Sequence, residues 1–220
     1  MTYSRETIRN GLFAELAEEG DRLGVFRPNT DAERAESLRR MLDGLPPDAD
    51  IWVFGYGSLM WNPAFEFVER RHATIHGWHR SFCLWTPLGR GTPDNPGLVL
   101  GLDRGGSCRG IAYRIAAGMR ESELSLLWQR EMISDGYLPR WIPIRCGADR
   151  TQAITWVINP QGPRYAGKLP LDTIARHLAT ASGRLGSSRD YLENTVNHLG
   201  ELGIRECGIH RIRDRVRGLT

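Results

Sequence analysis

From residue 50 to residue 158 the chain alternates short β-forming segments with glycine or proline at almost every gap. The expected strands are residues 51–56, 72–86, 98–102, 110–115, 138–144 and 151–158. One segment among them, residues 120–133, has the periodicity of a helix. Many short strands with so few helices between them favour a small, strongly curled β-barrel over a doubly wound parallel sheet.

Helices are expected on both sides of this β-rich region, which makes the predicted fold class α+β. The expected helices are residues 7–19, 31–42, 171–181 and 189–202, the last capped by Ser187 or Ser188. Asp31 occupies the position expected for the N-cap of the second helix. Residues 1–47 are interpreted as a helical arm that packs on a main domain, residues 48–208.

Composition and cysteine use exclude several classes of protein. Of the 220 residues, 40% are hydrophobic and 25% are charged, which is ordinary for a folded domain with its own core. The four cysteines are far apart and form no C-x-x-C pair, so no metal site is expected. The sequence shows neither a signal peptide nor an apolar run of about 20 residues. It therefore predicts a cytoplasmic protein with reduced thiols and no membrane segment.

The one concentrated run of basic residues lies at the C-terminus, where residues 210–217 read HRIRDRVR. A basic segment of this kind can contact nucleic acid. No zinc finger, RNP motif or recognition helix accompanies it, and an isolated charge run is more often a solvated terminus. Residues 209–220 are therefore interpreted as a basic tail, and no nucleic-acid partner is expected.

A glycine-flanked loop directly follows the first expected strand, where residues 54–60 read FGYGSLM. Successive backbone amides exposed in such a turn form a site for a carboxylate. The alternative is a tight turn that only connects two elements. The loop lacks the glycine spacing of a dinucleotide-binding motif and the lysine of a P-loop, and Ser58 lacks the G-x-S-x-G context of a serine hydrolase.

Glu131 is the second candidate functional residue. It follows Leu124, Leu127 and Trp128 by seven, four and three positions, so all four share one face of the expected helix. Burial on such a face raises the pKa of a carboxyl group toward the range useful for proton transfer. The alternative is a structural ion pair with Arg80 or Arg130.

Arg80 is the third candidate, because it lies in the middle of an expected strand that also carries histidine and tryptophan residues. An arginine in this position is expected to have an anionic partner. That partner is either the carboxylate of a substrate or a glutamate of this chain, for which Glu66, Glu69 and Glu131 are the candidates.

Several motifs in the same order resemble those of the ChaC-type γ-glutamylcyclotransferases. The resemblance begins with WVFGYGSLMWNP at residues 52–63 and continues with GWHRSF, GTP and GIAYR at residues 77–82, 91–93 and 110–114. It is strong again in LWQREM, residues 127–132, which is followed by YLP. It covers about residues 50–204 and extends to the N-terminal helices, which are similar to those of bacterial members.

The resemblance implies a curled β-barrel surrounded by helices and a lyase that converts glutathione into 5-oxoproline and Cys-Gly without a cofactor. It implies that Glu131 is the catalytic glutamate and that the γ-glutamyl group is bound by Tyr56, Gly57, Ser58 and Leu59. It also assigns substrate contacts to Arg80 and Tyr165. Two other functions remain open, namely a cyclotransferase for other γ-glutamyl compounds and a non-catalytic protein that binds such compounds.

Overall fold

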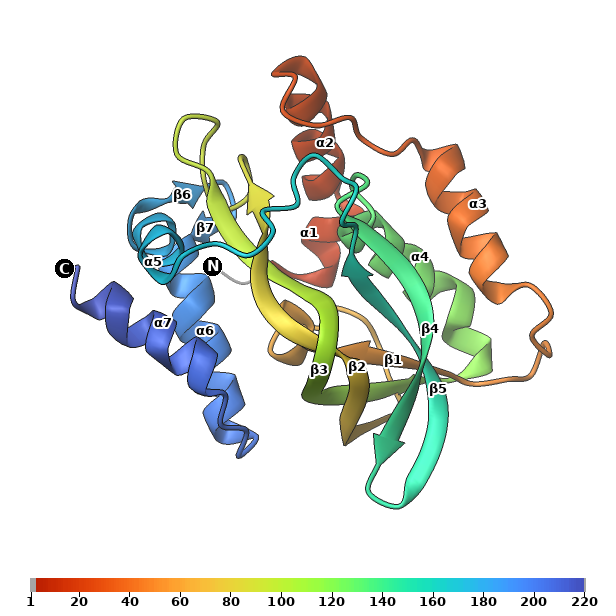
Figure 1. The fold of residues 1–220 in the computed structure, drawn as a ribbon. Coiled ribbons are helices and arrows are strands. Elements are labelled where there is room, and N and C mark those ends of the chain that lie inside the picture. The colour runs from red at the N-terminus through yellow and green to blue at the C-terminus, as the bar shows by residue number, and fades with distance from the viewer. Residues whose placement is uncertain (1–2, 220) are drawn as a thin grey trace.

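The computed structural model describes residues 3–219, and Figure 1 shows a central barrel with helices on two sides. Within these residues the barrel consists of β1 (Ile51–Gly55), β2 (Glu69–Thr86), β3 (Gly97–Ile115), β4 (Tyr137–Cys146) and β5 (Asp149–Ile158). The strands close in the order β1-β3-β2-β4-β5. Strand β1 is antiparallel to β3 and parallel to β5. The predicted small barrel is confirmed.

The segments 98–102 and 110–115 are not two strands, as the sequence suggested, but parts of the continuous strand β3. Gly105 and Gly106 between them have φ values of 99° and 69°. The register with β2 shifts at this level, next to Gly77, whose φ is 80°. These glycines form an irregularity within the paired strands, which increases their coiling, and not a gap between strands.

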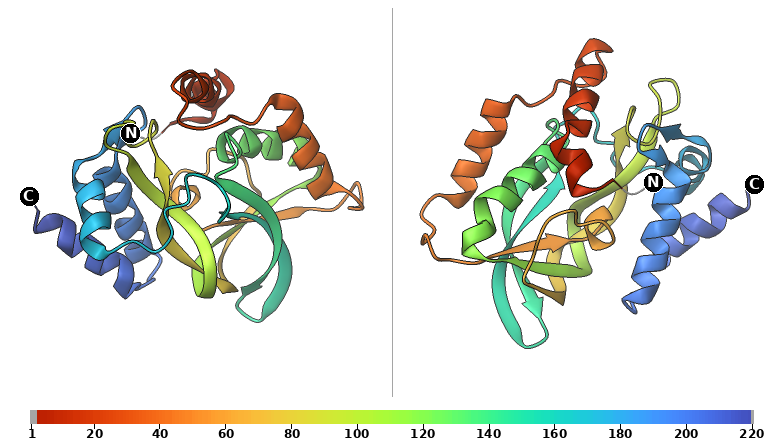
Figure 2. Two further views of the ribbon diagram at one scale, coloured as in Figure 1. Left: turned by 45° about the horizontal axis from the view of Figure 1, so that its top comes forward. Right: turned by 180° about the vertical axis from the view of Figure 1, so that it is seen from behind.

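The helices form two groups on opposite sides of the barrel (Figures 1 and 2). The first group contains α1 (Arg5–Arg9), α2 (Leu12–Arg22), α3 (Asp31–Leu42) and α4 (Arg120–Glu131), and the second contains α5 (Leu171–Thr180), α6 (Ser188–Glu201) and α7 (Cys207–Arg217). Short elements complete the chain, namely the 3₁₀ helices η1 (Ser58–Met60) and η2 (Ala117–Met119) and the paired strands β6 (Ser182–Gly183) and β7 (Gly186–Ser187). No helix within residues 3–219 has the length and apolar character needed to cross a membrane.

The helix ends correct two details of the sequence prediction. The helix expected at residues 7–19 is interrupted between α1 and α2, where Gly11 has a φ of 91°. The N-cap of α3 is Thr30 and not Asp31, because the Thr30 hydroxyl accepts from the amide of Glu33 in a capping box. The predicted cap of α6 by Ser187 is confirmed, since its side chain accepts from the amide of Asp190.

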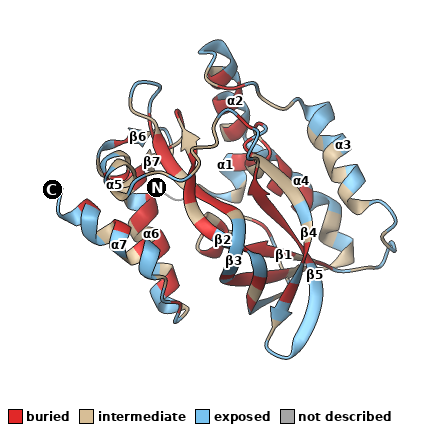
Figure 3. Cartoon of the chain, in the orientation of Figure 1, coloured by how far each residue is buried: buried red, intermediate tan, exposed pale blue. Residues whose placement is uncertain are grey.

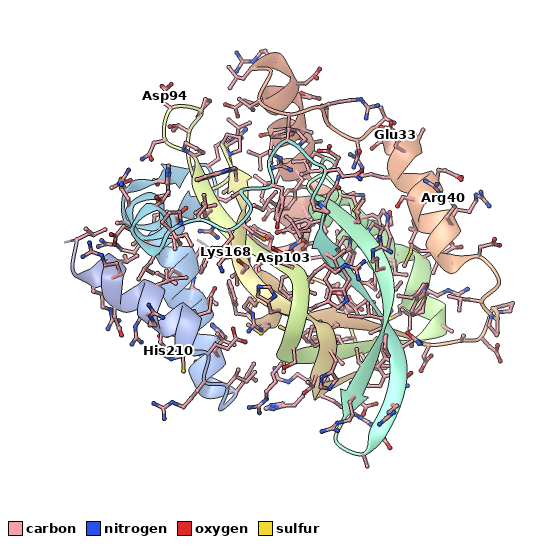
Figure 4. All side chains as sticks on the ribbon, viewed as in Figure 1. Glu33, Arg40, Asp94, Asp103, Lys168 and His210 are labelled. Atoms are coloured by element: carbon pink, nitrogen blue, oxygen red, sulfur yellow. The ribbon has the colours of Figure 1, made fainter. Side chains whose placement is uncertain are left out.

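The C-terminal segment is helix α7 and not the solvated terminus that its charge pattern favoured. Its apolar residues Ile209, Ile212 and Val216 are buried, and α7 packs on α5 and α6. Arg215 pairs with Asp172 of α5 at 2.6 Å. Figure 4 labels His210 on this helix. The charge run therefore alternates with an apolar face, and the helix completes the second group.

Helix α4 joins the first group of helices to the core of the barrel. The face of α4 that was predicted to be apolar is buried, as shown by its residues Leu124, Leu127 and Trp128. The Trp128 ring meets the Trp156 ring of β5 edge to face, with 5.3 Å between the ring centroids. Figure 3 shows this buried interior, in contrast to the exposed tip of the β4–β5 hairpin. Packing of α4 against the barrel fixes the position of Glu131 at its last turn.

Candidate active site

The loop after β1 and the end of α4 meet at one cavity. Its inner part is lined by Glu131 and by the four loop residues predicted from the sequence, Tyr56, Gly57, Ser58 and Leu59. The side chains of Tyr137, Trp156 and Tyr191 complete the lining. The structure therefore brings together the loop and Glu131, which are far apart in the sequence. Ser58 of the loop and Arg130, the neighbour of Glu131, are separated by 72 positions.

Hydrogen bonds from the barrel hold the loop in place. The Tyr56 hydroxyl donates to the carbonyl of Trp156 at 2.8 Å. The Thr155 hydroxyl of β5 donates to the carbonyl of Phe54, near the end of β1, at 2.9 Å. The Tyr113 hydroxyl donates to the carbonyl of Leu59 at 2.9 Å. These side chains satisfy buried carbonyls on both sides of the loop, so its backbone has one defined conformation.

Gly57 permits close contact between the loop and α6. A Cβ atom at this position would lie 3.1 Å from the hydroxyl oxygen of Tyr191. Ordinary carbon contacts are longer, so any side chain would press on that hydroxyl group. The glycine therefore allows the backbone of the loop to form part of the cavity wall.

The Glu131 carboxyl group is mostly buried, with 14% of its side chain exposed. Its Oε1 atom is shielded from solvent and has no hydrogen-bond partner of acceptable geometry among the described residues. Burial raises the pKa of this carboxyl above its usual range, and the nearby Arg130 guanidinium opposes part of that effect. A carboxyl group in this environment is suited to accept a proton and to return it.

Arg130 connects Glu131 to the loop. Its Nε lies 2.8 Å from Oε1 of Glu131, and its side chain is 2% exposed. Nη2 donates to Oγ of Ser58 at 2.8 Å, while Nη1 donates to the carbonyl of Asn62 at 2.5 Å. The ion pair proposed as an alternative role for Glu131 is therefore present with Arg130. It does not remove Glu131 from the cavity.

A wider, adjoining part of the cavity shares Ser58, Glu131, Tyr137 and Tyr191 with the inner part and contains further residues that the sequence analysis did not select. Arg90 and Arg164 line it, together with Tyr3, Phe13, Leu16 and Phe26 of the N-terminal arm. Arg90 is 6% exposed, and its guanidinium lies over the Tyr191 ring at 5.3 Å from the centroid. The one sequence signal for Arg90 is its place between two glycines, just before the GTP motif. The arm contributes directly to the wall of the site.

Arg80 and Tyr165 are not brought to this cavity. The Arg80 side chain is fully buried and pairs with Glu206, just before α7, and not with Glu66, Glu69 or Glu131. It also donates to the carbonyl of Tyr56, so it supports the loop from behind. The Tyr165 hydroxyl donates to Oδ2 of Asp103 at 2.7 Å, and Figure 4 labels Asp103 on β3. The substrate contacts implied for both residues do not follow from this arrangement.

The chemistry available in the cavity is proton transfer beside a polar backbone loop. The described residues contain no group of three or more His, Cys, Asp or Glu side chains placed to bind a metal ion. The cavity is lined by the Glu131 carboxyl group, whose pKa is raised, by the loop that leads into η1, and by tyrosine side chains. Such a set suits a reaction in which charge develops on a carbonyl oxygen while a nitrogen loses or gains a proton.

Comparison with known proteins identifies the family. The family model for ChaC-like proteins matches residues 51–218. The chain belongs to the ChaC-like family. A glutathione-specific γ-glutamylcyclotransferase from Escherichia coli is 43% identical over 188 residues, which cover 85% of this chain and 81% of that protein. γ-Glutamylcyclotransferase 2-1 from Arabidopsis thaliana is 36% identical over 154 residues, covering 64% and 70% of the two chains.

A solved structure shares the ChaC-like fold. The crystal structure of a γ-glutamyl cyclotransferase specific to glutathione from yeast superposes with a TM-score of 0.70 at 20% identity. It covers 78% of this chain and 99% of that chain, and at this identity it supports the fold alone. The ChaC-like match includes α7.

Proposed function

We propose that this ChaC-like protein is a γ-glutamylcyclotransferase that converts glutathione into 5-oxoproline and Cys-Gly, with Glu131 as general base and then general acid. The observation that carries the proposal is the placement of a mostly buried carboxyl group with a raised pKa against residues 56–59. The names of the similar proteins from E. coli and A. thaliana support the reaction type, and the E. coli protein supports the substrate.

The reaction needs one nucleophile, and the substrate supplies it. The α-amine of the γ-glutamyl residue attacks its own γ-carbonyl carbon, a new C–N bond closes the five-membered lactam, and the C–N bond to cysteine breaks. No electrons are gained or lost, so the proposal includes no cofactor. Holding the amine and carbonyl in contact supplies a large share of the acceleration, because the attack is intramolecular.

Glu131 moves the proton in this scheme. The substrate amine arrives as an ammonium ion and transfers a proton to the Glu131 carboxylate before attack. The protonated carboxyl then gives that proton to the cysteinyl nitrogen as the C–N bond breaks. The nitrogen of the new ring still carries one proton too many, and the regenerated Glu131 carboxylate passes this proton to the released amine, which leaves a neutral lactam and a protonated amine. The mostly buried position raises the pKa of Glu131 above that of a free carboxyl, which makes the carboxylate a better proton acceptor. Arg130 keeps the carboxyl directed toward the loop through its contact with Ser58.

The loop and Arg90 bind the γ-glutamyl group in this proposal. Residues 56–59 line the inner cavity, and in this proposal their backbone amides meet the oxygen of the γ-carbonyl as negative charge develops on it. Arg90, which is buried beside Tyr191, provides positive charge for the α-carboxylate. Arg80 supports the loop through the Tyr56 carbonyl and does not contact the substrate.

The test is incubation of the purified protein with glutathione, followed by mass detection of 5-oxoproline and Cys-Gly. We expect both products in equal amounts, without added metal or cofactor. Tight binding of glutathione without product would instead identify a non-catalytic binding protein. Faster release of 5-oxoproline from γ-Glu-Ala than from glutathione would identify a cyclotransferase with another physiological substrate.

A further inference from the structure

The wider cavity contains a second arginine, Arg164, that has no carboxylate partner in the part of the chain that the structure describes. Its Nε atom is shielded from solvent and makes no hydrogen bond to any described residue. Burial lowers the pKa of its guanidinium, and nearby Tyr137 and Asp135 oppose this effect without forming an ion pair with it. Arg164 is half-buried, and a cation partly removed from water without an anion is costly, so a carboxylate supplied by a ligand would stabilise it.

The protein holds this guanidinium in a defined place. Nη2 of Arg164 donates to Oγ of Ser134, and Nη1 donates to the carbonyl of Trp85 at 3.4 Å. The Phe26 ring of the arm lies against it, with 4.7 Å between the guanidinium carbon and the ring centroid. A Cβ atom at position 136 would lie 2.7 Å from Nη2, so Gly136 leaves the space that the guanidinium needs.

Arg164 lies in the wider part of the cavity, whereas the loop residues Tyr56, Gly57 and Leu59 line the inner part. Glu131 lines both parts. The proposed substrate carries two carboxylates, one next to the reacting amine and one at the far end of the peptide. Arg90 and Arg164 both line the wider part of the cavity, and neither has a carboxylate partner among the described residues. Arg90 lies over Tyr191, which also lines the inner part, and so corresponds to the α-carboxylate. Arg164 lies over Phe26, which lines the wider part alone, and so corresponds to the distant carboxylate.

We infer that Arg164, positioned by Phe26 and Ser134, binds the C-terminal carboxylate of the substrate and makes the enzyme selective for γ-glutamyl peptides that end in a free carboxylate. This inference rests on the proposed function and deepens it. A guanidinium forms two parallel hydrogen bonds to a carboxylate but none of comparable strength to a neutral amide. The selectivity therefore comes from the negative charge of the C-terminal carboxylate, which takes no part in the reaction.

The experiment compares glutathione with its C-terminal amide, in which glycinamide replaces glycine. For the unchanged protein we expect kcat/KM to be about 10- to 100-fold higher for the acid, the range expected for a hydrogen bond to a charged group. In Arg164→Met the value for glutathione falls by the same factor, mainly through KM, while the value for the amide changes little. Arg164→Lys keeps the positive charge but cannot form two parallel hydrogen bonds to a carboxylate. We therefore expect an intermediate preference for the acid over the amide.

Arg150→Met is the matched control, because Arg150 is exposed at the start of β5. We expect it to keep the full preference for the acid, and circular dichroism checks that each variant is folded. Equal kcat/KM for acid and amide in the unchanged protein would overturn the subsite and leave the proposed function standing. An acid-to-amide ratio unchanged in Arg164→Met would also overturn it. Absence of 5-oxoproline from both compounds would overturn the proposed function and the subsite together.

Discussion

The guanidinium of Arg130 lies 2.8 Å from Oε1 of its neighbour Glu131 and at the same time donates to Ser58 of the loop. From the sequence alone, an ion pair was the alternative to a catalytic role for Glu131. In the structure the two are compatible. The ion pair sets the direction of the carboxyl group, while burial still dominates the pKa of Glu131 and raises it. Arg130 also donates to the carbonyls of residues 62 and 63, which anchor it to the segment after η1.

The first prediction concerns Glu131→Gln. The substitution keeps the shape of the side chain but removes the group that takes up and returns a proton. We expect a folded protein in which kcat falls by at least about 100-fold. Release of 5-oxoproline under saturating glutathione measures this. Glu121→Gln is the matched control on the exposed side of the same helix and is expected to retain activity. Normal turnover by a folded Glu131→Gln protein would remove Glu131 from the mechanism.

The second prediction is a pH dependence of activity. As the base in the free enzyme, Glu131 must be ionised, and its pKa is raised above the ordinary value of 4.5. We therefore expect kcat/KM to fall on the acid side with a midpoint above 4.5. A pH profile with glutathione measures this midpoint. An acid limb at or below pH 4.5 would contradict the raised pKa as the origin of the profile.

The same raised pKa predicts a pH-dependent difference in stability. In the window that begins near pH 4.5 and ends at the folded pKa, the folded protein holds a proton on Glu131 that the unfolded chain has lost. Stability from this group is therefore present at low pH and decreases as pH rises through the window. We expect Glu131→Gln to gain stability relative to the unchanged protein between pH 4 and pH 7.5. Thermal unfolding of both proteins at the two pH values measures the change, and a constant difference would contradict it.

The sequence predicted the features of the site that depend on local patterns. The face of α4 that carries Glu131 follows from helical periodicity, and the loop at residues 54–60 follows from two glycines after an apolar strand. The convergence of Arg90, Arg164 and Tyr191 was not predictable in this way. Each comes from a separate segment, and only the closed barrel and the arm bring them to one cavity.

The errors in the fold prediction have the same physical origin. Gly105 and Gly106 were interpreted as a gap between strands, because a local pattern does not distinguish a turn from a bulge within a paired strand. The basic residues of α7 concealed the buried positions Ile209, Ile212 and Val216, which have helical spacing. In both cases, a tertiary partner decided the structure. The cytoplasmic location and the division of the chain at residue 47 stay predictions.

The fourth prediction concerns the contact between Gly57 and Tyr191. In Gly57→Ala the new methyl group would lie 3.1 Å from the Tyr191 hydroxyl, so either the loop or α6 must shift. We expect kcat to fall by about 10- to 100-fold, because a displacement of the loop misaligns the reacting groups. The double variant Gly57→Ala with Tyr191→Phe lacks the hydroxyl and is expected to recover part of this loss relative to Tyr191→Phe alone. Strictly additive losses would show that the two residues do not interact in this way.

The last prediction separates a supporting role of Arg80 from direct substrate binding. Arg80 is fully buried and donates to the carbonyls of Tyr56 and Arg109 while it pairs with Glu206. Arg80→Met leaves these acceptors unpaired, so we expect the free energy of unfolding to decrease by about 2–4 kcal/mol. At a temperature where the variant is folded, kcat falls because the loop loses support, and KM for glutathione changes by less than about threefold, since the guanidinium lies outside the cavity. Glu206→Gln keeps both carbonyl contacts and is expected to show a smaller effect on both quantities. A large rise in KM for Arg80→Met at unchanged kcat would instead restore Arg80 as a residue that binds the substrate.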